Sequence, residues 1–461
     1  MTAISSHIIA KLTDIVGSAL CTTRLEDLHC YSFDGTGKSF LPEVVVFPEN
    51  SDQVSRVMAL ASQFSFPVVA RGAGTGMTGG AVPLHGGLVL AMSRMNRIIE
   101  IDQKNQIGIV EPGVITGELQ KVVRDQGLFY PPDPASLNYC SIGGNAAECA
   151  GGPSAVKYGV TKDYIIGLEV VLASGEIITT GARTEKSVSG YDLTRLFIGS
   201  EGTLGIITKL IVRLLPLPPH KDTFLLRSTS LKRTTEMVSE LLNGNINPCT
   251  LEYMDRTAIK IVSDFMSDPP PPETEALLIV EIDGEKVLVA ERVKRLKTLL
   301  ENQPEFTITQ ATDSNDVEKL WQARRAISPS VFNLKPNKIS EDVAVPRSRI
   351  PDLVSFTEKL SEELNLIILT FGHAGDGNIH VNIALDRSDP DEVERAETAK
   401  TRIFEQTIKL QGTLSGEHGI GFSKSPFMAL EFNQATIAVM KKLKNLFDPK
   451  NILNPGKIFP E

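Results

Sequence analysis

The chain has 461 residues, of which 41% are apolar and 22% are charged, and its formal net charge at pH 7 is −9. This length suggests two or three domains, and the composition is that of a globular protein rather than a disordered chain. The basic residues are scattered and form no stripe, so we expect no nucleic-acid surface. The five cysteines include no C-x-x-C pair. This disfavours a disulfide framework, an iron–sulfur cluster or a cysteine zinc site, and it indicates reduced thiols in a cytoplasmic protein.

The first twenty residues, MTAISSHIIAKLTDIVGSAL, mix apolar and polar residues in a way that predicts an amphipathic helix. They lack the basic start and the unbroken apolar core of a signal peptide. No run of the chain approaches the apolar length that a membrane-spanning helix needs. We therefore expect a cytoplasmic protein with no membrane span, which would be peripheral to a membrane only through a partner.

Strands and helices are intermingled in the first half of the chain. Short β-branched runs predict strands at Val44–Phe47, Ile107–Val110, Ile165–Leu172 and Ile206–Leu215. Helical patterns cover Asp52–Phe64 and Gly117–Gln126, and Thr116 is the expected cap of the second. The alternation predicts an α/β or α+β first domain over residues 1–218.

The composition and the pattern of predicted elements change at Pro216–Pro219. Glycine becomes rarer, and longer amphipathic helices are predicted at Ser230–Leu242 and Lys286–Leu300, with a strand at ALLIVEIDG. These features predict a second, α+β domain over residues 219–415. Residues 416–461 form a C-terminal segment that is rich in turn residues near its end.

The first of three glycine-rich patches, PVVARGAGTGMTGG, contains Gly74-x-Gly76-x-x-Gly79 after a predicted strand. A Rossmann fingerprint of this form must open a helix that faces a diphosphate. Here Pro83 and further glycines follow, so no helix can continue and a nicotinamide enzyme is disfavoured. Successive backbone N–H groups can still bind a diphosphate, whereas the alternative is a plain surface turn or β-bulge.

All three glycine patches, together with the segments between them, resemble one known family. The motifs PEVVVFPENSDQV, RGAGTGMTGGA, PPDPAS, IGGNAAECAGG, KYGVTKDYIIGLEVVLASG and GYDLTRLFIGSEGTLGIIT occur in this order over most of residues 42–215. They are similar to the FAD-binding domain of the vanillyl-alcohol oxidase and p-cresol methylhydroxylase superfamily. The resemblance implies an α+β protein with a two-subdomain FAD-binding domain, a cap domain with an antiparallel sheet, and a C-terminal segment that returns to the FAD domain.

The same resemblance implies the residues that contact the cofactor. They are Pro67, Arg71, Gly72, Ala73, Gly74, Thr75, Gly76 and Thr78 in the first patch, Pro132, Ser136, Gly143, Gly144, Asn145, Ala147 and Gly151 in the second, and Glu201, Gly202 and Ile206 in the third. Some members of the superfamily bind FAD covalently through a histidine in the first loop. This chain has Met77 and Thr78 there, so we expect non-covalent FAD.

Three of the seven histidines lie within residues 373–418. In FGHAGDGNIHVNI, Asp376-Gly377 predicts a two-residue hairpin turn. Counting outward from that turn, His373 faces His380 directly and Phe371 faces Asn382. Two imidazoles that are directly opposed lie close enough to share a metal ion, although a single buried histidine is more often structural.

The second histidine segment is GTLSGEHGIG, in which a glycine loop presents Glu417 and His418. Two histidines and one carboxylate suit Zn²⁺, Fe²⁺ or Mn²⁺ and leave positions for a substrate. Both segments resemble the D-2-hydroxy acid dehydrogenase branch of the superfamily, which includes D-lactate dehydrogenase, the glycolate oxidase D-subunit and D-2-hydroxyglutarate dehydrogenase. The resemblance implies that His373, His380 and Glu417 hold the metal and that His418 is the catalytic base.

The expected substrate is a small D-2-hydroxy acid, either D-lactate or glycolate, whose hydride passes to the flavin. The resemblance of the Trp321-x-x-Arg324 motif assigns Arg324 to the substrate carboxylate, against the alternative of an exposed ion pair. Asn382 is a second expected polar contact. In the hydroxyglutarate members, Lys-Tyr-Asp usually precedes the Val-Pro of the segment KISEDVAVPRSRI, whereas this chain has Ser340, Glu341 and Asp342 there. The absence of that lysine favours a monocarboxylate substrate, although Lys338 lies near enough to replace it.

The alternatives are a D-2-hydroxyglutarate-type dehydrogenase and a flavin subunit that only transfers electrons in a complex. The resemblance implies that the electrons pass to an electron-transferring flavoprotein, an iron–sulfur subunit or a quinone. A homodimer is compatible with the sequence.

Overall fold

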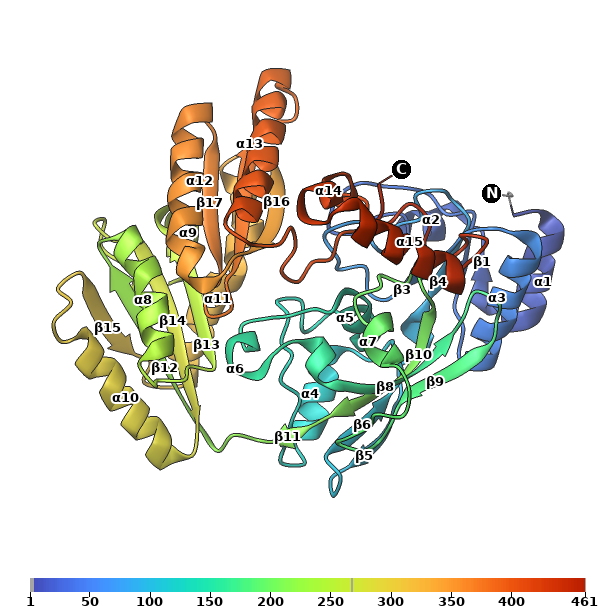
Figure 1. Cartoon of the computed structure of the whole chain (residues 1–461), viewed down its shortest axis with the longest axis horizontal. Coiled ribbons are helices and arrows are strands. Elements are labelled where there is room, and N and C mark those ends of the chain that lie inside the picture. The colour runs from blue at the N-terminus through green and yellow to red at the C-terminus, as the bar shows by residue number, and fades with distance from the viewer. Residues whose placement is uncertain (1–3, 267, 461) are drawn as a thin grey trace. The chain divides into compact units, whose positions relative to one another are not determined.

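A computed structural model describes residues 4–266 and 268–460 of the chain. It divides into two compact units (Figure 1). The first unit contains the chain up to Gly151, then Val160–Leu217, and finally the chain from Glu417 on, whereas the second contains Gly152–Gly159 and Pro218–Gly416. The sequence analysis placed residues 152–159 in the first domain, but they group with the second unit. Among the described residues, no helix is both long and apolar enough to cross a membrane.

The first unit contains a four-stranded sheet in the order β1-β2-β4-β3. Its strands are β1 (Cys21–Thr22), β2 (Val44–Val46), β3 (Val68–Arg71) and β4 (Leu88–Ala91), and both β2 and β3 pair with β4 in parallel. The predicted helices are present as α1 (Ser6–Val16) and α3 (Ser51–Phe64), and their apolar faces share one core with the strands. Asn50 caps α3 by accepting a hydrogen bond from the N–H of Gln53 at 3.0 Å.

The second sheet of this unit is antiparallel and has the strand order β5-β6-β10-β8-β9. Its strands are β5 (Ile98–Asp102), β6 (Ile107–Val110), β8 (Ile165–Val171), β9 (Ile177–Gly181) and β10 (Ile206–Arg213). The helix α4 spans Thr116–Arg124, so Thr116 is its first residue, and the prediction that Thr116 caps it was wrong. The Thr116 hydroxyl instead accepts a hydrogen bond from Nδ2 of Asn145 at 2.7 Å.

The C-terminal segment completes the first of these two sheets. Leu453 forms a parallel bridge with Val68 at the edge of β3. The N–H of Val68 donates to the carbonyl of Ile452 at 2.8 Å, and the N–H of Asn454 donates to the carbonyl of Val68 at 2.9 Å. The helix α15 (Gln434–Phe447) precedes this segment, and its buried Lys444 donates to the carbonyl of Thr203 at 2.9 Å.

The second unit is built on one seven-stranded antiparallel sheet in the order β15-β12-β14-β13-β17-β18-β16 (Figure 1). The strands are β12 (His220–Ser228), β13 (Thr250–Asp255), β14 (Ala276–Gly284), β15 (Phe306–Gln310), β16 (Asn337–Ala344), β17 (Ile367–His373) and β18 (Asn378–Leu385). The α+β fold with an antiparallel sheet in the second domain is therefore confirmed.

Besides the short α6 (Ala155–Tyr158), which contacts β13, six helices among the described residues of the second unit contact this sheet or one another. They are α8 (Leu231–Asn243), α9 (Arg256–Val262), α10 (Lys286–Leu300), α11 (Ser314–Ser330), α12 (Ile350–Leu364) and α13 (Pro390–Lys409). Ala258 of α9 and Ile327 of α11 share a core with Met254, Phe371 and Ala384 of the sheet. These two helices therefore cover the sheet face that carries the conspicuous polar side chains described below.

Candidate functional site

A cavity within the first unit is lined by all three glycine-rich patches. Of the predicted cofactor contacts, its lining includes Arg71, Gly72, Ala73, Gly74, Thr75, Gly76, Ser136, Gly143, Gly144, Asn145, Ala147, Glu201, Gly202 and Ile206. Between β3 and β4 the chain forms turns and no helix, as Pro83 led us to expect. The glycine patches therefore form one concave surface of small side chains and exposed backbone.

Two of these glycines have steric reasons to be glycine. Gly74 has φ +72°, and a Cβ atom there would lie 2.1 Å from Nη2 of Arg71. A Cβ on Gly143 would lie 2.4 Å from the Cβ of Pro112. Arg71 is only 5% exposed and donates to the carbonyl of Ala81 at 3.3 Å, and burial lowers the pKa of its guanidinium. Arg71 thus lies beneath the loop and braces it, in addition to lining the cavity.

Four predicted cofactor residues do not line the cavity. The carbonyl of Pro67 accepts the N–H of Leu88 at 2.9 Å, and the carbonyl of Pro132 accepts Nε2 of Gln120 at 2.9 Å. Thr78 donates its hydroxyl to the carbonyl of His418 at 3.0 Å. A Cβ on Gly151 would lie 2.8 Å from Oε2 of Glu417. These contacts support the cavity or the loop that carries Glu417 and His418, and both of those residues line the cavity themselves.

Sequence reasoning named Glu201 as a cofactor contact but missed its acidic neighbour at this cavity, Glu148. Glu148 ends a short helix, α5 (Ile142–Glu148), and lines the cavity, but its buried Oε2 has no hydrogen-bond partner among the described residues. Its neighbour Glu201 accepts the backbone N–H groups of Ile420 and Gly421, each at 2.7 Å. Burial, and then the charge of Glu201, raise the pKa of Glu148 well above its ordinary range. Burial also raises the pKa of Glu201, but the two backbone N–H groups that it accepts oppose this rise, so Glu148 is the acid of the pair whose pKa is raised more strongly.

In the second unit, the predicted register of the histidine hairpin was wrong by two residues. His373 pairs with Asn378, and His380 pairs with Phe371, because residues 374–377 form a four-residue loop instead of a two-residue turn. A shift of two residues leaves each side chain on its original face. His373 and His380 are consequently diagonal neighbours, with ring centroids 5.2 Å apart, and the expected proximity of the two rings holds.

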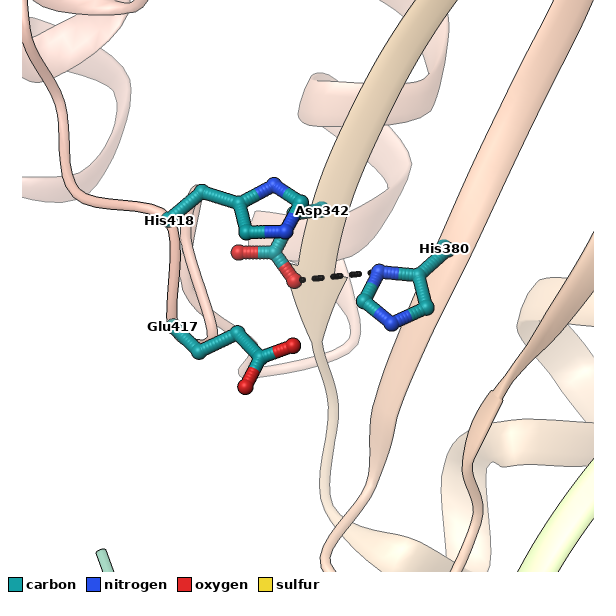
Figure 2. Close-up of side chains that lie close together, drawn as sticks. All are labelled: Asp342, His380, Glu417 and His418. Carbon is teal, nitrogen blue, oxygen red and sulfur yellow. Dashed lines mark ion pairs between the residues drawn. The ribbon is translucent and has the colours of Figure 1, made fainter. Parts of the chain in front are cut away.

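The two histidines are the centre of a row that crosses four strands. Glu252 of β13 lies directly opposite His373, and Asp342 of β16 lies directly opposite His380. Oε1 of Glu252 is 2.5 Å from Nδ1 of His373. Figure 2 shows the second acid contact, in which Oδ1 of Asp342 is 3.6 Å from Nδ1 of His380. The side chains of both acids are fully buried. Neither acid was predicted, because strands distant in sequence bring them to the row.

Arg324 of α11 joins the row through Glu252. Its Nε and Nη2 atoms lie 2.7 and 2.6 Å from Oε2 of Glu252, and its guanidinium lies over the Phe371 ring at 4.7 Å. Burial would raise the pKa of Glu252, but the neighbouring His373 and Arg324 lower it below its ordinary value. The expected exposed-pair alternative for Arg324 is wrong, because the arginine is 7% exposed.

Asn382 lies on the same sheet face, two residues beyond His380. It is fully buried, yet neither its Oδ1 nor its Nδ2 has a hydrogen-bond partner among the described residues. An amide left in this state costs about 1–3 kcal/mol, so such groups are rare unless a ligand completes them. Two imidazoles and an unpartnered amide oxygen on one face fit the donor set of a divalent metal.

Asp342 also anchors the loop that leads to Glu417. Its Oδ2 accepts the hydroxyl of Ser415 at 3.0 Å and the N–H of Gly416 at 2.9 Å. Gly416 is the last residue of the second unit. Glu417 and His418, which Figure 2 draws with Asp342 and His380, are the next two residues along the chain.

Comparisons with known proteins agree with these features. The sequence matches the model of FAD linked oxidases, C-terminal domain, over residues 217–458 and that of an FAD binding domain over residues 42–181. It is 43% identical to the glycolate oxidase subunit GlcD of Bacillus subtilis, over 93% of this chain and 92% of that protein. It is 34% identical to a probable mitochondrial D-lactate dehydrogenase of Danio rerio, over 90% of this chain and 84% of that protein.

Solved structures show the same fold at low sequence identity. The 4-ethylphenol oxidase of Gulosibacter chungangensis superposes with a TM-score of 0.81 at 20% identity, covering 100% of this chain and 99% of that one. For p-cresol methylhydroxylase with substrate bound, the TM-score is 0.79 at 18% identity, covering 98% of this chain and 96% of that one. The expected superfamily fold is therefore confirmed.

Proposed function

This chain belongs to the family of FAD-linked oxidases and is an FAD-dependent oxidoreductase, and from that premise we propose that it oxidises glycolate or D-lactate to the 2-oxo acid at a metal-assisted site. The substrate class is supported by the names of relatives that are 43% and 34% identical over nearly the whole chain. The single observation that carries the site is the row of acid, histidine, histidine and acid across four strands beside an unpartnered Asn382.

The cavity of the first unit fits FAD. Gly72, Gly74 and Gly76 would leave backbone N–H groups open to the diphosphate, and Gly143 and Gly144 would let a flat ring approach the main chain. FAD, when bound, supplies a two-electron acceptor for the hydride of the substrate. The residues of the chain would then hold the substrate next to this acceptor and exclude water. The first glycine-rich patch, residues 67–80, has Met77 and Thr78 and no histidine, which supports a non-covalent cofactor.

We propose a divalent metal held by His373 and His380 of the row together with Glu417, with zinc, iron and manganese as the candidates. Figure 2 shows His380 with Glu417, His418 and Asp342, each of which offers a ligand atom of a metal-binding type. Such a metal would lower the pKa of a substrate hydroxyl. Asn382 would complete the polar surroundings with its amide.

Proton transfer and substrate orientation fall to His418 and Arg324. An imidazole nitrogen of His418 would accept the hydroxyl proton of the substrate, because a neutral imidazole is an effective base near pH 7. The main chain of His418 is held by Thr78. Glu252 occupies the Nε–Nη2 edge of Arg324, so Nη1 points away from Glu252 and would bind the substrate carboxylate.

A D-2-hydroxyglutarate-type dehydrogenase is the second candidate, and Lys338 is the observation that bears on it. Lys338 lies on the sheet face of Asn382, two positions along β16 from its partner Ser340. Its Nζ already donates to the carbonyl of Ser328 at 2.7 Å and to the hydroxyl of the same residue. Because these hydrogen bonds already occupy the Lys338 ammonium, they compete with a second substrate carboxylate. This favours a monocarboxylate substrate. A subunit that only transfers electrons would not require the buried row of acid, histidine, histidine and acid.

Electrons would then leave through a partner. The curated relatives include proteins named as subunits of glycolate oxidase. We propose an electron-transferring flavoprotein, an iron–sulfur subunit or a quinone as the acceptor for this chain. A cytoplasmic location, with membrane association only through such a partner, remains part of this proposal.

The experiment is anaerobic bleaching of the flavin by D-lactate, L-lactate, glycolate and D-2-hydroxyglutarate, each with and without EDTA. We expect bleaching by glycolate or D-lactate that EDTA abolishes and zinc, iron or manganese restores. His373→Ala should remove the response, whereas His220→Ala, on β12 and outside the row, should retain it. A yellow protein that none of these acids bleaches would contradict the proposal. Bleaching that EDTA does not affect would remove the metal from it.

A further inference from the structure

One buried carboxylate, Glu252, contacts two functional side chains with two different oxygens. Oε1 lies 2.5 Å from Nδ1 of His373, and Oε2 lies 2.7 Å from Nε and 2.6 Å from Nη2 of Arg324. The side chain of Glu252 is completely buried and that of Arg324 is 8% exposed. Water therefore cannot replace either partner, and each oxygen is committed to one of them.

The contact to His373 has a consequence for its tautomer. A carboxylate at Nδ1 requires a hydrogen on that nitrogen, which leaves Nε2 with the lone pair. Metal-binding histidines depend on such an outer hydrogen bond, because it orients the ring and makes the coordinating nitrogen more basic. The direct opposition of Glu252 and His373 on adjacent strands fixes this geometry through the backbone register.

The contact to Arg324 has a consequence for its orientation. A guanidinium is a planar fork, and binding one edge to a carboxylate sets the direction of the remaining edge. Phe371 lies under the same guanidinium at 4.7 Å and limits its rotation. The position of Nη1 is therefore determined by the same side chain that determines the tautomer of His373.

We propose that Glu252 is a positioning residue that sets the spacing between the metal and the substrate-carboxylate clamp. This inference rests on the proposed function and deepens it, because it explains why the site would bind 2-hydroxy acids. In such a substrate the hydroxyl and the carboxylate are on adjacent carbons, so the metal and the arginine must be held at one fixed separation. A single carboxylate that holds His373 and Arg324 provides that separation.

The matched control is Glu281 of β14, which is also a buried carboxylate on this sheet. It is held by Thr223 at 2.8 Å, Lys221 at 2.8 Å and Trp321 at 3.1 Å, and no hydrogen bond or ion pair joins it to His373 or Arg324. Glu252→Gln and Glu281→Gln each remove one buried negative charge from the same sheet. A general loss of stability would therefore affect both variants, whereas a loss of positioning would affect Glu252→Gln alone.

The test measures two equilibria on the FAD-loaded full-length protein. One is zinc affinity, by chelator competition, and the other is the affinity for oxalate at saturating zinc, from the shift of the flavin absorbance. We expect Glu252→Gln to weaken zinc binding about 10- to 100-fold and to weaken oxalate binding as well. Glu281→Gln should change neither, and Arg324→Lys should weaken oxalate binding with zinc affinity unchanged.

The outcomes distinguish a failure of the proposed metal dependence from a failure of the positioning role of Glu252. Wild-type protein that binds no zinc would overturn the proposed metal dependence and this inference with it. Wild-type zinc binding with an unaltered zinc affinity in Glu252→Gln would overturn the inference alone. If Glu252→Gln does not fold, nitrogen-15 NMR of histidine-labelled, zinc-loaded wild-type protein decides the question. Zinc on Nε2 of His373 with a proton on Nδ1 supports the inference, and zinc on Nδ1 overturns it.

Discussion

The N–H of Gly416 donates a hydrogen bond of 2.9 Å to Asp342, a fully buried acid that lies directly opposite His380. The same oxygen accepts the hydroxyl of Ser415. One side chain therefore holds the loop immediately before Glu417 and also faces an expected metal ligand. This double role makes Asp342 the most informative position outside the proposed ligand set.

The other oxygen of Asp342, Oδ1, accepts a hydrogen bond from Nδ2 of Asn378 at 2.5 Å. Asp342→Asn should disrupt the anchor, because an amide that keeps its oxygen in this contact presents an N–H group to the N–H of Gly416. We expect zinc affinity to fall at least tenfold and the free energy of unfolding to fall by about 1–3 kcal/mol. Chelator competition and urea unfolding measure the two effects. Ser415→Ala, which removes only the hydroxyl contact, should have a clearly smaller effect on both. Equal effects of the two variants would show that the Gly416 contact is unimportant.

Asn382→Leu should separate stability from function. Both polar atoms of this buried amide lack partners among the described residues, so a leucine of similar volume removes an unsatisfied group. We expect the melting temperature of the metal-free protein to stay the same or rise, while oxidation of glycolate or D-lactate falls strongly.

The control for this prediction is Asn454→Leu. That amide is also buried, but its Nδ2 donates to the carbonyls of Gly80 at 2.8 Å and Glu201 at 2.7 Å. Its replacement should destabilise the protein. An Asn382→Leu variant that is destabilised as much as Asn454→Leu would contradict the ligand role of Asn382.

Gly74→Ala should weaken FAD binding more than its backbone strain explains. Gly74 and Gly37 have almost the same positive φ, +72° and +71°, but only at Gly74 would a Cβ meet Arg71, whereas at Gly37 nothing lies within 4 Å. Each alanine should cost about 1–2 kcal/mol of stability from the conformation alone. Fluorescence titration of the apoprotein should then show a loss of FAD affinity for Gly74→Ala and wild-type affinity for Gly37→Ala. Similar FAD affinities in the two variants would show that the loop around Gly74, which Arg71 supports, does not contribute to cofactor binding.

Glu148→Gln should make the protein more resistant to rising pH. Burial and the neighbouring Glu201 raise the pKa of Glu148 above its ordinary value of 4.5, so folding favours the protonated form. The stability that this proton contributes is fully present below the ordinary pKa and is lost as the pH rises through the raised pKa. We expect the melting temperature of the wild type to fall relative to that of Glu148→Gln between pH 5 and pH 9, measured by calorimetry with excess FAD. Parallel curves would mean that Glu148 is ionised in the folded protein.

Local sequence patterns predicted most of the elements that surround the site. Lys286–Leu300 is a helix and ALLIVEIDG is a strand, because amphipathic and β-branched patterns depend on nearby residues alone. The three glycine patches were expected to contact one cofactor because their motifs resemble those of a known superfamily, and they line one cavity. The hairpin register failed because Asp376-Gly377 lies within a four-residue loop, and turn length depends on packing, including that of Val156 against Gly375.

The acids of the row could not be found by such reasoning. Glu252 and Asp342 stand 121 and 38 residues before the histidines that they face, and only the strand order β13-β17-β18-β16 brings them together. A single sequence contains no direct record of strand order. The partnership of Arg324 with Glu252 is hidden for the same reason, because it joins a helix to a strand 72 residues away.

The pairing of Val68 with Leu453 has a consequence for biosynthesis. The edge of β3, from which the first glycine-rich patch begins, has a backbone partner 385 residues further along the chain, because Val68 pairs with Leu453. Domains generally fold as units during synthesis, the N-terminal one first. The edge of β3 beside the first glycine-rich patch therefore stays without this partner until the second unit has been translated. Folding of the first unit is thus tied to residues that follow the second unit in the chain.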